Sequence, residues 1–106
     1  MKIAIIGSTQ YVEKFAELAN HLRKQGHTVM LPALDAHPEL DDLGVCEFNR
    51  DMIEQADEVR VIWDARSFGT WGDFMMAFAL RKRVVIEYIE EKTMAGVMRK
   101  YSKSCE

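Results

Sequence analysis

Hydrophobic positions along the chain follow two different spacings that alternate from one segment to the next. Short continuous apolar runs indicate buried parallel strands, whereas apolar positions three or four residues apart indicate amphipathic helices. The continuous runs predict strands at residues 2–6, 27–31, 58–63 and 83–88. The helical spacing predicts helices at residues 11–25, around apolar positions 45–56, and at residues 71–80 and 90–101.

The alternation of strands and helices predicts an α/β fold in a single domain spanning residues 1–106. Right-handed crossovers between successive strands produce a parallel sheet with helices on both faces. The simplest topology is a flavodoxin-like or Rossmann-like open sheet of four to five strands in the order 2-1-3-4. The long connection from Pro32 to Leu43 has no clear period, and such loops in small domains are often functional or mobile.

Two polar loops are expected to meet in the crevice where the strand order reverses, between the first and third strands. Ligands of open parallel sheets bind at such a point, outside the carboxyl ends of the strands. Backbone amides and hydroxyl groups in both loops suit a phosphate or a sugar hydroxyl at a helix N-terminus. A simple N-cap role for Ser8 or Thr9 is the alternative, and Asp64 could cap or bind. The candidate substrate-binding residues are Gly7, Ser8, Thr9, Asp64, Ser67, Gly69 and Thr70.

A carboxylate, Asp73, follows the second loop at the start of the third predicted helix. It is placed to act on a ligand in the crevice. Its structural alternative is a capping box in which Thr70 is the N-cap and Asp73 lies at position N3. Three aromatic residues flank the predicted crevice and could stack on a base or simply pack: Tyr11, Trp63 and Trp71.

Composition narrows the classes of function. A net charge of −3 argues against a protein that coats a nucleic acid polymer. Cys46 and Cys105 match no metal spacing and are expected to be free thiols in a reducing compartment, with Cys46 buried or half-buried in a helix. The apolar run near Met1 is too short for a signal peptide or membrane span, which predicts a cytoplasmic protein without membrane attachment. His27 and His37 belong to no recognisable ligand cluster, so no metal and no cofactor is predicted.

The chain up to about residue 88 resembles the nucleoside 2-deoxyribosyltransferase superfamily, including its branch of nucleoside 5′-monophosphate N-glycosidases. That family has alanine–aspartate before a strand, a small-residue turn, a catalytic glutamate with G-x-A, and a basic residue before the next strand. The first strand and its loop, Ile5-Ile6-Gly7-Ser8, also resemble the family. The other matching segments are Gln55-Ala56-Asp57, Gly69-Thr70-Trp71-Gly72, Asp73 at the nucleophile position, residues 74–79, Lys82 and Val84-Val85.

The resemblance implies that Asp73 is the catalytic nucleophile and that Asp57 is a second catalytic residue that orients the substrate or supports the site. It also implies that Ser8, Ser67 and Gly69 contact the 5′ end of the substrate. Two positions depart from the family: Asp73 is one methylene shorter than glutamate, and Met75 replaces a small residue and is expected to crowd the site or shift the helix. Ser67 matches the monophosphate branch, whereas the transferases have aspartate there, and this favours a phosphate-bearing substrate.

We therefore expect an N-glycosidase or deoxyribosyltransferase-like enzyme that cleaves the N-glycosidic bond of a nucleoside or its 5′-monophosphate. Attack by an ionised Asp73 on the anomeric carbon would resemble a retaining glycosidase, and the helix N-terminus would favour the charged form. A non-catalytic nucleotide-binding module and an oligomerising domain without a ligand are the alternatives. The expected partners are a small nucleoside or nucleotide and further copies of the chain, with Tyr101 and the last helix as an interface. An oligomer would also cover the edges of so small a sheet.

Overall fold

Four parallel strands form one sheet in the order β2-β1-β3-β4. The computed structural model describes residues 1–32, 39–90 and 93–104. The fold class and the strand order predicted from the sequence are both confirmed, with four strands in the sheet. The strands are β1 (Lys2–Gly7), β2 (Thr28–Met30), β3 (Glu58–Trp63) and β4 (Arg83–Ile89).

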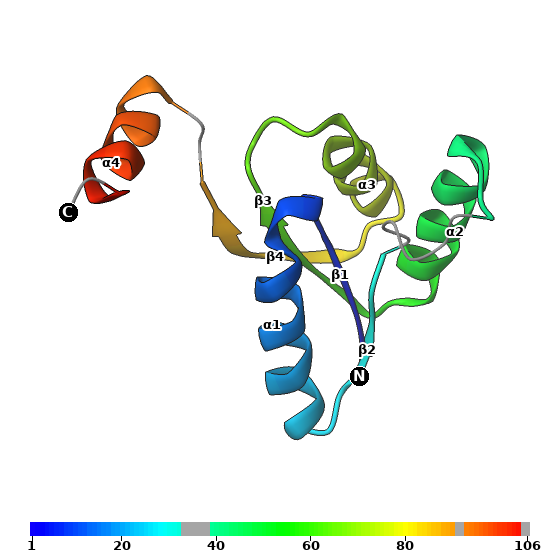
Figure 1. Cartoon of the computed structure of the whole chain (residues 1–106). Helices are drawn as coiled ribbons and strands as arrows, with labels where there is room; N and C mark the ends of the chain where they lie inside the picture. Colours follow the sequence, from blue (N-terminus) through cyan, green and yellow to red (C-terminus); the bar gives the residue numbers. More distant parts are fainter. Residues whose placement is uncertain (33–38, 91–92, 105–106) are drawn as a thin grey trace.

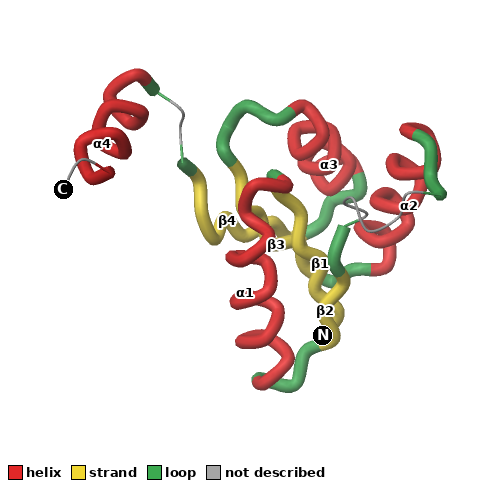
Figure 2. Tube along the Cα trace, viewed as in Figure 1, coloured by secondary structure: helices red, strands yellow, loops and turns green. Residues whose placement is uncertain are grey.

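Helices cover the sheet on both sides. Figure 1 shows α1 on one face and both α2 and α3 on the other, while α4 stands apart beyond the end of β4. Figure 2 shows the same arrangement with the strands of the sheet between the helices. The elements are the short 3₁₀ helix η1 (Thr9–Tyr11), α1 (Val12–Lys24), α2 (Asp42–Gln55), α3 (Phe68–Ala79) and α4 (Met94–Ser104).

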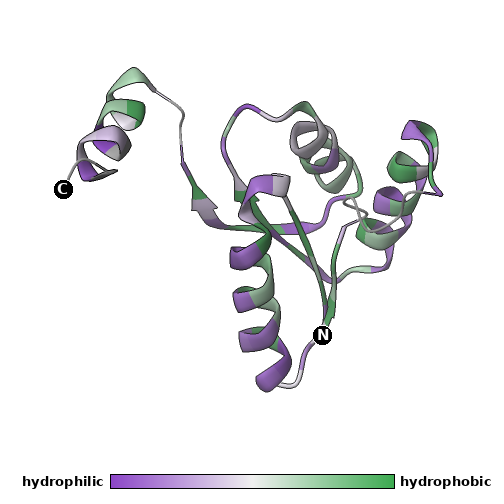
Figure 3. Cartoon of the chain, viewed as in Figure 1, coloured by the Kyte–Doolittle hydropathy of each residue, from purple (hydrophilic) through white to green (hydrophobic). Residues whose placement is uncertain are grey.

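The central strand β1 is buried on both of its faces. Ile3 and Ile5 pack with α1, whereas Ala4 and Ile6 pack with residues of α2 and α3, and all four are fully buried. This explains why β1 is a continuous apolar run, since both faces of a strand in a parallel sheet are covered. Figure 3 shows the resulting contrast between the hydrophobic central strands and the hydrophilic outer side of α1.

Helices α2 and α4 begin at different residues from those predicted, as does α3, which is described with the site below. Helix α2 begins at Asp42, before the first apolar position of its pattern, because the Asp41 carboxylate accepts a hydrogen bond of 2.7 Å from the Gly44 amide. Helix α4 begins at Met94 rather than at residue 90, and the Thr93 hydroxyl accepts from the Gly96 amide at 3.0 Å. Half of the predicted long connection, residues 33–38, lies outside the described part of the chain.

Two further expectations concern the burial of Cys46 and the absence of membrane attachment. Cys46 is exposed on α2, so the prediction that it is buried or half-buried is wrong, and Cys105 lies outside the described residues. Over residues 1–32, 39–90 and 93–104, no helix is both long enough and apolar enough to cross a membrane.

Candidate functional site

The loops after β1 and β3 meet at the carboxyl edge of the sheet, as the strand order requires. Gly7 pairs with Ile62 across the two strands, and the Ser8 amide donates to the Ile62 carbonyl at 3.0 Å. The two loops, the end of β2 and the facing sides of α2 and α3 enclose a pocket of about 280 Å³. Its lining residues are Gly7, Ser8, Thr9, Pro32, Val45, Asn49, Ser67, Gly69, Thr70 and Asp73. Seven of the nine residues predicted for the site therefore lie in one pocket.

Gly7 lets these two loops approach each other. A Cβ atom at this position would lie 1.9 Å from the Ile62 carbonyl oxygen and 2.8 Å from the Phe15 ring. Only glycine fits where the backbone of β3 comes so near. The glycine thus serves the geometry of the pocket wall, whatever the pocket holds.

Three hydroxyl groups form a hydrogen-bonded chain across the pocket. The Asp64 amide donates to Ser8 Oγ at 3.2 Å, Ser8 Oγ lies 3.0 Å from Ser67 Oγ, and Ser67 Oγ donates to Thr70 Oγ1 at 2.8 Å. Since Ser67 gives its single proton to Thr70, Ser8 is the donor to Ser67. This order leaves the Thr70 hydroxyl proton to be donated. The N-cap expected of the Ser8 side chain is not formed, because its hydroxyl faces the opposite loop.

Asp64 shapes the second loop from behind the pocket. Its Oδ1 accepts hydrogen bonds from the amides of Arg66, at 2.9 Å, and Ser67, at 3.0 Å, and its Oδ2 accepts from Gln10 Nε2 at 3.0 Å. These bonds hold a tight turn in which Ala65 has a φ of 63°, a left-handed conformation that is costly for alanine. Asp64 is buried and does not line the pocket, so we assign it to loop positioning rather than to the predicted substrate contact.

Asp73 lies on the inner side of α3 and is 8% exposed. Burial raises the pKa of its carboxyl to about 6, and a hydrogen bond of 3.3 Å from Asn49 Nδ2 to Asp73 Oδ2 opposes that shift. The carboxyl thus titrates closer to neutrality than an ordinary aspartate. A group with this pKa in a pocket is a candidate for chemistry.

The capping-box alternative for Asp73 is wrong, because α3 begins three residues earlier than predicted. Ser67 is the N-cap residue, and the Trp71 amide closes the first turn on the Ser67 carbonyl at 3.2 Å. Thr70 therefore lies in the first turn and Asp73 in the second. The helix N-terminus was expected to favour the charged form of Asp73; burial acts in the opposite direction and raises the pKa of this carboxyl.

Asp57 lies outside the pocket. It is exposed just before β3, at the opposite edge of the sheet, where its carboxylate accepts from the Lys2 amide at 2.8 Å. The six residues of β3 separate it from the pocket by about 20 Å. The structure therefore does not bring the two predicted catalytic carboxylates together in one pocket.

Asn49 is the residue that the sequence reasoning missed. It lies one helical turn after Val45 on the inward face of α2, and it is 7% exposed. A polar side chain within the apolar stripe of an amphipathic helix needs a buried partner. That signal was present in the sequence, although it does not identify Asp73 as the partner.

The aromatic residues predicted to flank the crevice do not line it. Trp63 stacks on Trp71 with ring centres 6.0 Å apart, and Trp71 stacks on Phe74 at 6.2 Å. Tyr11 packs edge to face against Tyr88 at 5.4 Å. These contacts correspond to the packing alternative for all three predicted residues.

Met75 does not crowd the pocket. Its side chain is 38% exposed on the outer side of α3, and it is not among the pocket residues. The expectation that Met75 crowds the site is therefore wrong. The expected shift of the helix stays a prediction.

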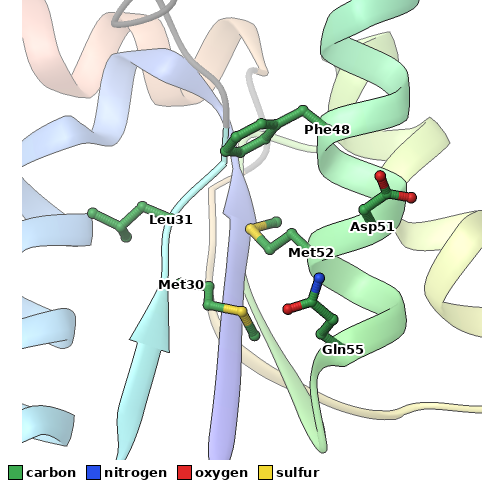
Figure 4. Close-up of a pocket in the computed structure, with 6 residues that line it drawn as sticks. All are labelled: Met30, Leu31, Phe48, Asp51, Met52 and Gln55. Carbon is green, nitrogen blue, oxygen red and sulfur yellow. The ribbon is translucent and has the colours of Figure 1, made fainter.

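A second pocket, of about 220 Å³, lies beside α2 at the edge strand β2 and is mostly apolar (Figure 4). Its carboxylate, Asp51, is exposed and pairs with Arg50 at 3.4 Å. This second pocket contains none of the predicted catalytic or substrate-binding residues. In the described part of the chain, no cluster of three His, Cys, Asp or Glu side chains could hold a metal ion. The residues that line this second, mostly apolar pocket are Met30, Leu31, Phe48, Asp51, Met52 and Gln55.

Comparison with known proteins gives a family and a fold neighbour. Residues 3–86 match the family model described as a domain of unknown function (DUF4406). The chain belongs to this family. A comparison with curated proteins finds no match. Among solved structures, the CMP N-glycosidase BcmB of Clostridium botulinum is similar, with a TM-score of 0.65, 17% sequence identity, and coverage of 97% of this chain and 81% of that one.

The match to the DUF4406 family includes every residue of the pocket and ends within β4. Helix α4 lies beyond the matched range. At 17% identity, the likeness to the glycosidase shows a shared α/β fold. The resemblance to the N-glycosidase branch is thus supported at the level of the fold.

Proposed function

We propose that this protein is an N-glycosidase, or a related transferase, that acts on a nucleoside 5′-monophosphate with Asp73 as its nucleophile. The observation that supports this most is the position of Asp73: a buried carboxyl with a pKa near 6 faces the same pocket as three hydroxyl groups and a helix N-terminus. The fold shared with a CMP N-glycosidase is consistent with such a reaction.

The pocket suits the sugar and phosphate of a nucleotide. Its volume of about 280 Å³ is at the lower end for a ligand pocket, which fits a sugar phosphate better than a larger cofactor. The Thr70 hydroxyl, at the end of the hydrogen-bonded chain from Ser8 through Ser67, can donate to a phosphate oxygen, and the first-turn amides of α3 have no intrahelical acceptor. We assign the 5′-phosphate to this end of the pocket, together with Gly7, Thr9 and Gly69 as its walls.

The proposed reaction begins with attack of an Asp73 carboxylate oxygen on C1′ of the sugar. The bond between C1′ and the base nitrogen breaks through an oxocarbenium-like transition state, and its electron pair leaves with the base, which takes a proton from water. The product is a glycosyl ester of Asp73. Water then attacks C1′, the ester bond breaks, and a proton goes to solvent as the carboxylate is regenerated. In a transferase, a second base would replace this water.

Burial and ionisation have opposite effects on this nucleophile. A desolvated carboxylate is more reactive than a hydrated one, but it must be ionised, and the pKa of about 6 means that it is ionised above neutral pH. Asn49 favours the charged form through its hydrogen bond to Oδ2 and leaves Oδ1 for the sugar. Asn49 therefore acts as a positioning residue.

The test is release of free base from a panel of nucleosides and nucleoside 5′-monophosphates, measured by chromatography. We expect release from at least one monophosphate, and a rate at least about 10³-fold lower in Asp73→Asn. Asp51→Asn, which removes an exposed aspartate from α2, is the matched control and should retain full activity. Absence of base release across the panel, or full activity in Asp73→Asn, would refute the proposal.

A non-catalytic nucleotide-binding module is the second candidate, and the observation in its favour is the short side chain at position 73. Aspartate holds its carboxyl about one carbon–carbon bond further from the ligand than glutamate would. A binding module would show a rise in melting temperature with a nucleotide that is not consumed. If Asp73→Glu creates base release that the native chain lacks, the native chain is the binding module.

A further inference from the structure

Helix α3 has no polar side chain on its outer side. Its only two polar side chains, Thr70 and Asp73, are both buried against the pocket. Ala77 also faces the core, whereas every exposed position of the helix is a hydrophobic residue or glycine. A surface helix ordinarily has polar residues on the side that faces water, so the outer side of α3 departs from that pattern.

The exposed side is dominated by four large side chains. Phe68 is 89% exposed, Phe78 is 68%, Trp71 is 49% and Met75 is 38%. At about 150–250 Å² per aromatic side chain, the three aromatic residues alone expose roughly 400 Å². A contiguous apolar patch of this size on a soluble domain marks an interaction site.

The spacing of the four residues is symmetric about position 73. Phe68 and Phe78 each lie five residues from that position, and Trp71 and Met75 each lie two residues from it. When two copies of such a helix lie antiparallel, Phe68 of one copy faces Phe78 of the other, and Trp71 of one copy faces Met75 of the other. This is the property of an isologous interface, in which one patch pairs with itself across a two-fold axis.

Two hollows provide room for this contact. One of about 280 Å³ lies beside Phe68 at the N-terminal end of α3, and one of about 580 Å³ lies beside Phe78 at the C-terminal end. A cavity of about 150 Å³ accepts a benzene ring. In the antiparallel pair, the partner's Phe68 lies over the hollow beside Phe78, and the partner's Phe78 lies over the hollow beside Phe68.

The helix surface also allows close approach. A Cβ atom added at Gly72 would meet nothing within 4 Å, and Ala79 is exposed on the same side. The three aromatic residues of two copies would together bury roughly 800 Å², and Met75 and the flanking positions add to this. The total approaches the 1,200 Å² or so at which specific interfaces begin.

We propose that the outer face of α3, formed by Phe68, Trp71, Met75 and Phe78, binds the same face of a second copy of this chain in an antiparallel, two-fold symmetric pair. The interface lies on the opposite side of α3 from Asp73, so each pocket stays open in the dimer. The inference does not depend on the proposed N-glycosidase activity. It differs from the interface expected from the sequence, which was the last helix.

Sedimentation velocity of the full chain tests the interface. We expect a dimer at micromolar concentration, and at least a 100-fold weaker dimer when Phe78→Glu places a charge in the apolar contact. Met98→Glu, at a position 56% exposed on α4, and Leu43→Glu, 66% exposed on α2, are matched controls and should stay dimeric. Circular dichroism checks that each variant is folded. A native monomer at 100 µM, or a dimer that only Met98→Glu dissociates, would overturn the proposal.

Disulfide cross-linking tests the antiparallel direction, in a chain carrying Cys46→Ser and Cys105→Ser. Phe68→Cys and Phe78→Cys should cross-link only when the two variants are mixed. In the antiparallel pair these positions face each other, whereas two copies of position 68 lie about 15 Å apart, too far for a disulfide. Cross-linking of either variant with itself would indicate a parallel pair. No cross-link in any combination would indicate that another surface covers α3, and both results contradict the proposal.

Discussion

Asp73 should make the protein less stable as pH rises, and Asp73→Asn should remove that effect. Burial raises the pKa of this carboxyl from 3.8 to about 6 in the folded state. The native chain therefore holds the proton more tightly than the unfolded chain between about pH 4 and pH 6. The free energy of unfolding falls as pH rises through this window, and the effect levels off above about pH 7.

The magnitude follows from the size of the shift. A pKa difference of about two units corresponds to about 3 kcal/mol between the two protonation states. At pH 4 the native protein and Asp73→Asn should have similar stability, because both have a neutral side chain that can accept the bond from Asn49. At pH 8 the variant should be more stable by about 3 kcal/mol, which corresponds to a rise on the order of 10 °C in melting temperature.

Urea unfolding of both proteins between pH 4 and pH 8 measures this difference. The protein concentration is kept constant, since a dimer makes stability depend on concentration. Subtracting the two curves removes the other titrating groups that both chains share. Asp51→Asn is the control for loss of one exposed carboxyl group. A difference for Asp73→Asn that does not grow with pH, or a variant less stable than the native chain at pH 8, would refute the reasoning.

Three further predictions test other parts of the site. Asn49→Leu removes the hydrogen bond that lowers the pKa of Asp73, so base release should begin only at higher pH, as measured by the pH profile of kcat/KM; an unchanged profile would exclude Asn49 as a positioning residue. Ser67→Ala should weaken binding of a nucleoside 5′-monophosphate about tenfold and leave binding of the nucleoside unchanged, as measured by calorimetry; equal loss for both would remove the phosphate from this end of the pocket. Gly7→Ala should destabilise the chain by more than about 3 kcal/mol, because the Ile62 carbonyl occupies the space of the new methyl group. Gly69→Ala, where the new methyl group meets nothing, should change stability by less than about 1 kcal/mol. Similar melting temperatures for the two variants would contradict this.

The convergence of the two loops could be predicted from the sequence, because it follows from topology. Strands that alternate with helices form right-handed crossovers, and the order 2-1-3-4 then brings the residues after Gly7 and after Trp63 to the same edge. The position of Asp57 follows from the same topology, although the sequence-based prediction did not apply it. A residue before a strand lies at the opposite edge from a residue after it, and the resemblance included both residues without that distinction.

The details within the loops depend on side-chain contacts that have no sequence period. Asp64 has the composition of a ligand-binding residue, but two backbone amides and Gln10 satisfy its oxygens, so it shapes the loop. The start of α3 was misplaced because Gly69 suggested a loop. Glycine is tolerated in a first helical turn, and here the Ser67 carbonyl accepts from the Trp71 amide to close that turn.

The inward polar residues and the outward aromatic residues of α3 link the pocket to the proposed interface. In an ordinary surface helix, an inward aspartate would cost stability and outward aromatic side chains would favour aggregation. Here both features belong to one helix, and each has its own proposed explanation. The inward Asp73 and Thr70 are explained by a ligand that needs a carboxylate and a hydroxyl, and the outward Phe68 and Phe78 by a second chain that covers them. Dimerisation would compensate on one side of α3 for the stability lost on the other. Phe78→Glu should therefore lower the melting temperature of the native chain at high protein concentration, and additional loss of the Asp73 charge should restore part of it.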